Sequence, residues 1–388
     1  MQYTSKRAKK LIPNSIFSKM NKLAQNNNVI NFGIGFPDYP ASDFIKEAAI
    51  QAIKNDMNQY ASCRGLPKLR QAIVDRMQNR YQVSYHPDTD VILTQGATEA
   101  IFATMQALVD PGDEVIMFEP CYTTYLPGIQ LAGGIPRFYT FFPPDWSLDE
   151  VKLKSMFSDK TRLILINTPH NPTGRVFNDK EMSLIAELCL KYDVIAVSDE
   201  VYEDLIFDSK KHIPLYTYPG MHNRTVTVST FGKTFGVTGW KVGWTVSSPE
   251  LAEPILRIHE YVCGSGTAPV QEAAAQALSM PQSFYDDVAS QYEAKRNYLC
   301  SALKDSGFNP IVPSGTFFFM ADFSDFDFDN DIDFCRYLLQ EISVNVIPGS
   351  AFYHSSLPEH IKIVRFVFCK KDETLKEAAR RLKILRHE

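Results

Sequence analysis

Lys233 stands in the segment Phe231–Gly236, where its neighbours are aromatic residues, glycines and a threonine. The sequence places no carboxylate within five positions of this lysine. An amine kept away from water and from acids has a lowered pKa and can act as a nucleophile. A surface lysine in a glycine-rich loop fits the same residues equally well, so the pattern predicts a candidate nucleophile and leaves its role open.

Two further charged residues are predicted to lie against the protein interior. Asp199 directly follows the apolar segment 194–198, and a buried carboxylate is costly unless a cation or several donors face it. A cationic ring nitrogen would satisfy it, although an acid that caps the next helix fits as well. In the segment 361–368 the alternation of a strand places Arg365 on an apolar face. Its planar guanidinium matches a substrate carboxylate, with an internal salt bridge as the alternative.

The triplet Gly96-Ala97-Thr98 falls where a predicted strand turns into a helix. Backbone N–H groups and a hydroxyl at that point would meet an anion at the positive end of the helix dipole, so a phosphate would fit. A glycine that only makes the turn, with Thr98 as the helix cap, is the simpler explanation of this triplet. No Gly-x-Gly-x-x-Gly follows a strand, so a dinucleotide site is not predicted.

Short apolar runs alternate with longer amphipathic runs through the middle of the chain, which predicts an α/β fold. Strands are predicted over 91–94, 114–118, 162–167, 194–198 and 226–228, and helices over 97–109, 122–132 and 179–192. Runs such as 163–166 are apolar on both faces, as in a parallel or mixed sheet covered by helices. Ligands bind beyond the carboxyl ends of such strands, so the polar clusters there are expected to form one site.

The last hundred residues predict a smaller α+β unit. Helices are predicted over 283–306, 332–341 and 372–385, and strands over 316–321 and 361–369. The first 40 residues lack a strong period and are rich in Pro, Gly and Asn, so we expect an arm that packs on a larger body.

The composition argues against several classes of protein and of site. The 388 residues include 40 basic and 45 acidic side chains, a formal net charge of −5, without the long basic stripe of a nucleic-acid-binding protein. No run approaches the roughly 18–20 apolar residues of a membrane helix. The seven cysteines are scattered without a Cys-x-x-Cys pair, and no two histidines fall at His-x-x-x-His spacing. We therefore expect reduced thiols in a cytoplasmic protein and no metal site.

Three motifs occur together in this chain: Ser229-x-x-x-Lys233 followed by Gly239-Trp240-Lys241-Val242-Gly243, the turn Asn171-Pro172-Thr173-Gly174, and Ser198-Asp199-Glu200-Val201-Tyr202. In combination they resemble the class I/II aminotransferases, pyridoxal-phosphate enzymes of fold type I, over nearly the whole chain. The segments 33–38, 59–60 and 167–172 are most similar to the methionine/kynurenine aminotransferase branch. The resemblance implies a three-layer αβα large domain with a mostly parallel central sheet over 41–282, and a small α+β domain over 283–388 that the arm, residues 1–40, partly completes.

The resemblance also implies a role for each site residue. Lys233 would be the Schiff-base lysine and the acid/base, Asp199 would keep the cofactor's ring nitrogen protonated, and Tyr202 would bind the ring oxygen together with Asn171. The other cofactor contacts would come from Ala97, Thr98, Tyr122, Ser229 and Lys241, with Tyr60 reaching the phosphate from the partner subunit of a homodimer. The substrate would be bound through its carboxylate by Arg365, Asn171 and Gly35, and through its side chain by an aromatic pocket that includes Phe17, Tyr122, Tyr39 and Phe352, of which the last two are better explained by packing.

The predicted reaction is a ping-pong transamination from methionine or an aromatic amino acid to a 2-oxo acid. Gly264 and Ser265 stand where kynurenine-handling relatives carry a Phe-His pair, so we expect a roomier pocket and leave the use of kynurenine open. A cysteine-conjugate β-lyase on the same fold is an alternative. A non-catalytic binding module is much less favoured, because such regulators carry an appended DNA-binding segment that we do not expect here.

Overall fold

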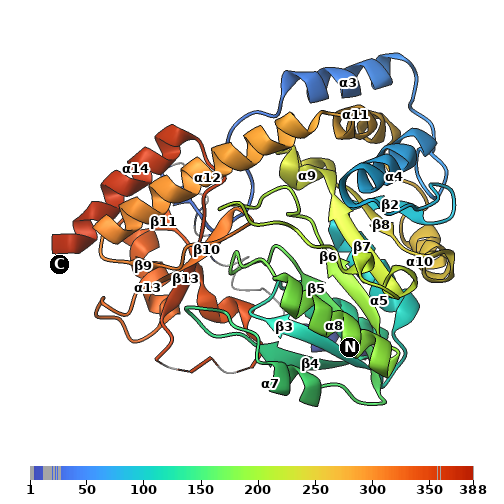
Figure 1. Cartoon of the computed structure of the whole chain (residues 1–388). Helices are drawn as coiled ribbons and strands as arrows, with labels where there is room; N and C mark the ends of the chain where they lie inside the picture. Colours follow the sequence, from blue (N-terminus) through green and yellow to red (C-terminus); the bar gives the residue numbers. More distant parts are fainter. Residues whose placement is uncertain are drawn as a thin grey trace.

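The computed structural model describes residues 4–11, 20, 22, 24, 28–355, 357–358 and 360–387. At its centre lies a seven-stranded sheet in the order β2-β8-β7-β6-β5-β3-β4 (Figure 1). The strands are β2 (Val91–Gln95), β3 (Glu114–Glu119), β4 (Ile135–Thr140), β5 (Thr161–Asn167), β6 (Ile195–Asp199), β7 (Thr225–Thr230) and β8 (Val242–Val246). Only β8 is antiparallel to its neighbours, which confirms the predicted mostly parallel sheet.

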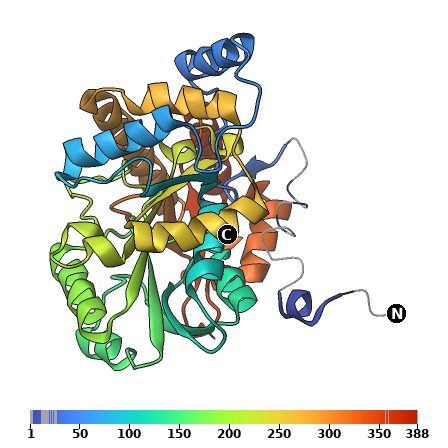
Figure 2. The ribbon, with the colours of Figure 1, turned by 90° about the vertical axis from the view of Figure 1, so that its right-hand side faces the viewer.

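Both faces of this sheet are buried by helices. Along β5, Leu163 and Leu165 pack with α5 (Gly96–Leu108), α6 (Tyr125–Ala132) and α10 (Pro249–Val262). Ile164 and Ile166 point the opposite way and pack on the side of α8 (Asp179–Tyr192). Alternate side chains of one apolar strand therefore enter two cores, as the strand period of two requires. Figure 2 shows α8 and α5 on opposite sides of the strands, so the large unit has three layers.

Three more helices complete the large unit beside β2 and β8. They are α3 (Asp43–Lys54), α4 (Pro67–Tyr81) and α11 (Ala268–Leu278), and α11 contacts both of the others. Leu93 of β2 and Trp244 of β8 pack against apolar side chains of α4 and α11. The short helix α9 (Phe231–Thr234) follows β7, and its Phe231 belongs to the same apolar cluster as Leu69 and Ile73 of α4.

The C-terminal residues form a second, smaller unit. Its four-stranded antiparallel sheet has the order β12-β13-β10-β9, with β9 (Asn309–Pro310), β10 (Phe318–Asp322), β12 (Ile347–Pro348) and β13 (Ile363–Val367). The helices are α12 (Gln282–Asp305), α13 (Asp331–Gln340) and α14 (Asp372–Leu382). The arm joins this unit because β1 (Ile30–Asn31) pairs with β11 (Val344–Asn345).

Several elements differ from the sequence predictions. The helix predicted over 122–132 begins at Tyr125, because residues 123–124 form a turn, and this leaves Tyr122 outside the helix. The sequence did not predict the strands β4 and β8 or the short strands β1, β9, β11 and β12. It also did not predict the helices α1 (Lys6–Lys10), α3, α4, α7 (Glu150–Ser155), α9, α10 and α11. The 3-10 turns lie at Leu215–Thr217, His222–Arg224, Thr238–Trp240, Gly349–Phe352 and Lys383–His387. Within the described ranges, no helix has both the length and the apolar character needed to cross a membrane.

Candidate active site

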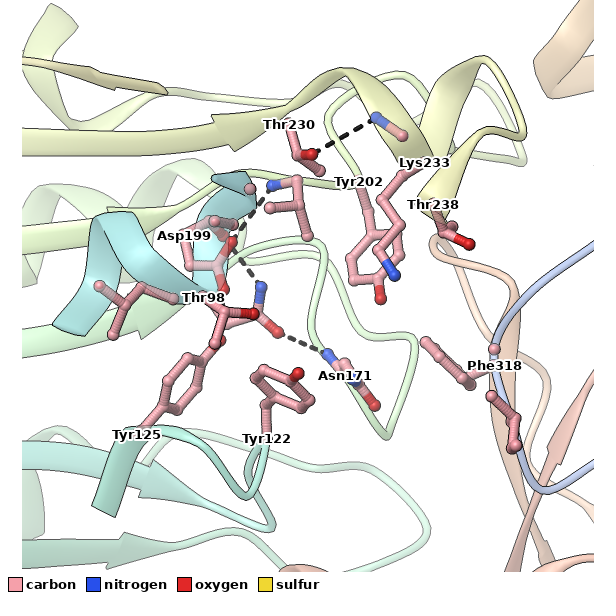
Figure 3. Close-up of a pocket in the computed structure, with 18 of the residues that line it drawn as sticks. Thr98, Tyr122, Tyr125, Asn171, Asp199, Tyr202, Thr230, Lys233, Thr238 and Phe318 are labelled. Carbon is pink, nitrogen blue, oxygen red and sulfur yellow. Dashed lines mark hydrogen bonds between the residues drawn. The ribbon is translucent and has the colours of Figure 1, made fainter. Parts of the chain in front are cut away.

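A cavity of about 250 Å³ lies beyond the carboxyl ends of the parallel strands, between the two units (Figure 3). Strands β2, β5, β6 and β7 all end at it, so residues far apart in the sequence meet there. Ten predicted site residues line it: Gly35, Ala97, Thr98, Tyr122, Asn171, Asp199, Tyr202, Lys233, Lys241 and Arg365. The polar strand ends therefore line a single cavity, as expected.

Three predicted site residues are not among the residues that line this cavity. Tyr60 lies in the loop between α3 and α4, with 94% of its surface exposed. Ser229 is buried in β7, whereas the next residue, Thr230, does line the cavity. Phe17 lies outside the described residues.

Lys233 reaches the cavity from α9, a helix of only four residues that follows β7 directly. Thr230 is the N-cap of this helix: its Oγ1 accepts a hydrogen bond from Gly232 N at 3.3 Å and donates one to Val242 O at 2.7 Å. The lysine side chain extends into the cavity beside Tyr202 (Figure 3). Its Nζ lies 5.6 Å from the centroid of the Tyr202 ring and 5.5 Å from that of Phe317.

The surroundings of Lys233 lower its basicity. Burial by the surrounding protein lowers the pKa of Lys233 from 10.5 to about 8, and the positive charges of Lys241 and Arg365 act in the same direction. Cys369 and Asp199 oppose this shift. Lys233 is only partly exposed, and it lines the cavity. The alternative of a surface lysine is therefore wrong, and an amine with nucleophilic character is what the geometry provides.

Asp199 is the last residue of β6, with a side chain that hydrogen bonds hold in place. Its Oδ2 accepts from the hydroxyl of Tyr125 at 2.5 Å, and its Oδ1 accepts from Val201 N at 3.3 Å. Burial raises the pKa of Asp199 to about 6, while these two hydrogen bonds and the charge of Lys233 limit the rise. Residues 201–204 form turns and no helix begins there, so the alternative of a helix cap is wrong.

The N-terminus of α5 has the features predicted for an anion site. This helix begins at Gly96, and its N-cap residue Gln95 provides no side-chain cap, so the proposed capping role of Thr98 is wrong. Lys241 Nζ instead approaches Thr98 Oγ1 at 3.5 Å. A Cβ on Gly243 would lie 2.4 Å from the carbonyl carbon of Gly96, so only glycine permits this close approach of two backbones. Helix N–H groups and an ammonium thus converge where a phosphate would be stabilised.

Arg365 is on β13 and lines the cavity, with 3% of its surface exposed. Its Nη1 donates to Asn171 Oδ1 at 3.0 Å and its Nη2 donates to the carbonyl of Gly33 at 2.7 Å. The guanidinium carbon lies 4.2 Å from the centre of the Phe318 ring. Burial lowers the pKa of Arg365 to about 9, so the desolvated cation is well suited to bind an anion.

Several residues that line the cavity received no role in the sequence analysis, although Asn167 and Thr230 belong to the polar clusters at the strand ends. Tyr125, Asn167, Thr230, Thr238 and Phe318 line the cavity together with the predicted residues. Asn167 connects two of the predicted residues: its Nδ2 donates to the Asp199 carbonyl at 2.9 Å, and its Oδ1 accepts from Asn171 N at 2.7 Å. Asn167 is the last residue of β5 and so belongs to a polar strand-end cluster, whereas Tyr125 carried no such signal.

The comparisons with known proteins agree with this geometry. Residues 27–382 match the Aminotransferase class I and II family. The chain belongs to this family. Among its relatives, kynurenine–oxoglutarate transaminase 3 of Homo sapiens is 36% identical, with 97% of this chain and 89% of the relative covered. Methionine aminotransferase of Escherichia coli (strain K12) is also 36% identical, and the match covers 96% of each chain.

Solved structures show the same fold for this aminotransferase. The crystal structure of YbdL from Escherichia coli, for which a methionine aminotransferase function was identified, has a TM-score of 0.95 and 35% identity. That match covers 99% of this chain and all of the other. The structure of N-succinyldiaminopimelate aminotransferase from Mycobacterium tuberculosis also has a TM-score of 0.95, with 37% identity over 98% of this chain and 100% of the other.

Class I and II aminotransferases depend on pyridoxal phosphate, and so does this enzyme. The cavity fits this cofactor. It offers an anion site at the N-terminus of α5, a buried acid at Asp199 for the ring nitrogen, and an amine of lowered pKa at Lys233 for the aldehyde. When bound, pyridoxal phosphate supplies an electron sink for the negative charge that remains on the substrate Cα after its proton is removed.

Proposed function

We propose that this aminotransferase transfers the amino group of methionine or of an aromatic amino acid to a 2-oxo acid. The names of its methionine and kynurenine aminotransferase relatives support this substrate class. The cavity supports it as well, because Ile34, Tyr122 and Phe318 give it an apolar and aromatic lining close to Arg365. Apolar side chains gain free energy when such surfaces remove them from water.

One observation carries the proposal: a single cavity contains the amine of Lys233, with its pKa lowered to about 8, the acid of Asp199 and the guanidinium of Arg365. In our proposal, Lys233 Nζ holds the cofactor covalently and later takes the proton from the substrate Cα. Asp199 keeps a proton on the ring nitrogen, because an ionised carboxylate favours the cationic ring. Tyr202 donates a hydrogen bond to the ring oxygen.

In our proposal, the other residues of the site make the following contacts. Ala97, Thr98 and Lys241, with Ser229 as a further candidate, bind the phosphate, and Tyr122 stacks on the ring. Arg365 grips the substrate carboxylate, assisted by the backbone of Gly35 and by Asn171. Because Asn171 Oδ1 already accepts from Arg365, its Nδ2 remains as the donor toward the cofactor or the substrate. Binding the carboxylate at two points orients the Cα–H bond toward the base.

Three alternative substrate classes can be distinguished from the proposed donors by experiment. Kynurenine is an aromatic donor whose use stays open, because Gly264 and Ser265 stand where kynurenine-handling relatives carry a Phe-His pair. A β-substituted cysteine would test a lyase activity on the same fold. An N-succinylated diamino acid, the substrate named for the Mycobacterium tuberculosis relative, carries a distal carboxylate. The cations among the described cavity residues are Lys233, Lys241 and Arg365, all of which already have a role in our proposal, and this favours the apolar donors.

We further propose a homodimer in the cytoplasm. Tyr60, Tyr261 and Val262 are large side chains with 94%, 90% and 52% of their surface exposed, which supports a partner on this side of the chain. Tyr60 would then reach the partner's phosphate site. The seven cysteines, all in the described part of the chain, are free thiols, as a reducing compartment favours. We keep the proposed division into an arm (1–40), a large domain (41–282) and a small domain (283–388).

The test is a visible absorption spectrum of the purified enzyme with pyridoxal phosphate, recorded before and after addition of a single amino acid. A chromophore that changes with methionine or phenylalanine, and returns when a 2-oxo acid is added, is expected. Borohydride reduction and peptide mapping should place the cofactor on Lys233, and Lys233→Ala should abolish transfer. A faster response to the N-succinylated diamino acid, or release of pyruvate and ammonia from a β-substituted cysteine as the dominant reaction, would replace the proposed substrate class.

A further inference from the structure

Asp204 holds three hydrogen-bond donors behind the cavity. Its Oδ2 accepts from the hydroxyl of Thr234 at 2.8 Å. Its Oδ1 accepts from Arg80 Nη1 at 2.6 Å and also from Arg76 Nη2. The side chain of Asp204 is 5% exposed, so this carboxylate binds its three donors in a nearly water-free environment.

These donors come from separate parts of the chain. Thr234 is adjacent to Lys233 in α9, whereas Arg76 and Arg80 lie one turn apart on α4. Asp204 itself follows Tyr202 by two residues in the segment after β6. One carboxylate therefore joins the helix that carries the cofactor lysine, the segment that carries Tyr202, and a long helix of the large unit.

Opposite charges hold this cluster of Asp204, Arg76 and Arg80 together. Burial disfavours the ionised form of Asp204, but the two arginines and the hydrogen bond from Thr234 together outweigh burial and lower its pKa, so the carboxylate stays charged. Arg80 also contacts Glu203 at 3.4 Å, and the Arg76 guanidinium lies 4.1 Å from the centre of the Tyr285 ring. Because removing one partner leaves the others buried without compensation, such a network resists rearrangement.

The helix α9 needs support from outside itself. It has four residues, and glycines stand at positions 232, 236 and 239 within and after it. Gly236 has φ +68, in the left-handed region that favours glycine. Glycine-rich backbone loses more conformational entropy on ordering than other sequences, so a short helix of this kind is not fixed by its own hydrogen bonds.

We propose that Thr234 and Asp204 are a positioning pair: the hydrogen bond between them fixes α9 against α4, so that the adjacent Lys233 keeps its amine in the cavity beside Tyr202. The inference rests on the proposed role of Lys233. It assigns neither residue a contact with the cofactor or the substrate. Loss of the Thr234 hydroxyl allows α9 to shift and water to reach the lysine, while the two arginines still hold the Asp204 charge.

The test compares Thr234→Val with Thr234→Ser, which keeps the hydroxyl, and with Thr225→Val. Thr225 is a matched control because it lies at the other end of β7, is also buried, and donates through its hydroxyl to the carbonyl of Met221 at 2.8 Å. In the cofactor-free proteins, reductive methylation over a range of pH with peptide mapping gives the pH midpoint of Lys233. The charged or ionisable groups around this amine, Asp199, Tyr202, Lys241, Arg365 and Cys369, are the same in every variant.

We expect Thr234→Val to raise that midpoint by about half a pH unit or more, because water admitted to the amine relieves its burial. In the loaded enzyme kcat should fall about tenfold, as for the loss of one hydrogen bond to a charged group, with KM within about twofold. Thr234→Ser should restore both values, and Thr225→Val should match wild type in both.

A Thr234→Val protein with the wild-type midpoint and kcat overturns the proposal, as does an equal change in Thr225→Val. If Thr234→Val does not fold, Thr234→Ala is judged by the same criteria. Borohydride mapping of the wild-type enzyme distinguishes a failure of the proposed function from a failure of the positioning pair. An adduct on a lysine other than Lys233 refutes the proposed function, whereas an adduct on Lys233 with an unaffected Thr234→Val refutes only the positioning pair.

Discussion

The hydroxyl of Tyr125 favours the ionised form of Asp199. Replacing Tyr125 with phenylalanine therefore tests the electrostatics at this end of the cavity. Its hydroxyl donates to Asp199 Oδ2 at 2.5 Å, and both residues are buried. A hydrogen bond to a charged group contributes about 1.5–3 kcal/mol, which corresponds to about 1–2 pH units in the pKa of the carboxyl. The pKa of Asp199 is already raised to about 6, so Tyr125→Phe should raise it to about 7–8.

The expected consequence is a pH-dependent loss of affinity for pyridoxal phosphate. The bound cofactor favours ionised Asp199, so each pH unit below the pKa of the cofactor-free protein weakens binding about tenfold. Variant and wild type should therefore bind equally well above about pH 9, while at about pH 5.5 the variant should bind about 10–80-fold more weakly. The ratio of the two dissociation constants at each pH cancels the ionisation of the cofactor itself and of Lys233.

Fluorescence titration of the cofactor-free proteins with pyridoxal phosphate measures this ratio. Tyr139→Phe is the matched control, because Tyr139 is equally buried but its hydroxyl accepts from Asp149 N at 2.6 Å, away from Asp199. The control should give a ratio close to one at every pH. A Tyr125→Phe ratio that is raised but does not vary with pH would show that Tyr125 acts through packing and would refute the electrostatic reasoning.

Three further predictions follow from the site. In the cofactor-free protein, reductive methylation of Lys233 should have its midpoint near pH 8, the lowered pKa of this amine. At pH 7 about 9% of the amine is then neutral, instead of about 0.03% at the ordinary pKa. A midpoint near pH 10.5 would contradict the burial of the amine. Arg365→Lys keeps the positive charge but loses the planar guanidinium that can bind a carboxylate at two points. The KM for the amino acid should therefore rise about 10–100-fold, while transfer from an amine without a carboxylate stays unchanged. Steady-state kinetics with both kinds of donor measure this difference. Gly243→Ala would place a Cβ 2.4 Å from the Gly96 backbone, so cofactor affinity measured by titration should fall, and wild-type affinity would show that the two backbones are free to separate.

Much of the fold and part of the site could be predicted because they depend on local patterns. The strand that ends at Asp199 is a continuous apolar run, and such a run in a covered sheet has a definite end where a polar residue appears. The helix over 179–192 is equally local, since Asn178 and Glu181 form its capping box. In both cases the residues that define the boundary are neighbours in the sequence.

The failures have a common physical cause, which is contact between distant segments. Thr98 has the residue type of a helix cap, but Lys241 approaches its hydroxyl from 143 positions away. The bond from Tyr125 to Asp199 depends on the packing of α6 beside the end of β6, and nothing near either residue indicates it. The link between Thr234 and Asp204 also depends on tertiary packing, so it became visible only in the structure.

The two buried charges of the site explain why a protein would keep an unfavourable arrangement in its cofactor-free form. Burial raises the pKa of Asp199 from 3.8 to about 6, so its cost grows as pH rises from about 3.8 and is complete above about 6. Burial lowers the pKa of Lys233 to about 8, so its cost is present below pH 8 and disappears as pH rises toward 10.5. Both charges are therefore costly together between about pH 6 and 8, and their mutual attraction offsets only part of the cost. A cationic ring opposite Asp199 and a covalent bond at Lys233 would remove both costs, so the same burial that strains the cofactor-free protein favours binding of pyridoxal phosphate.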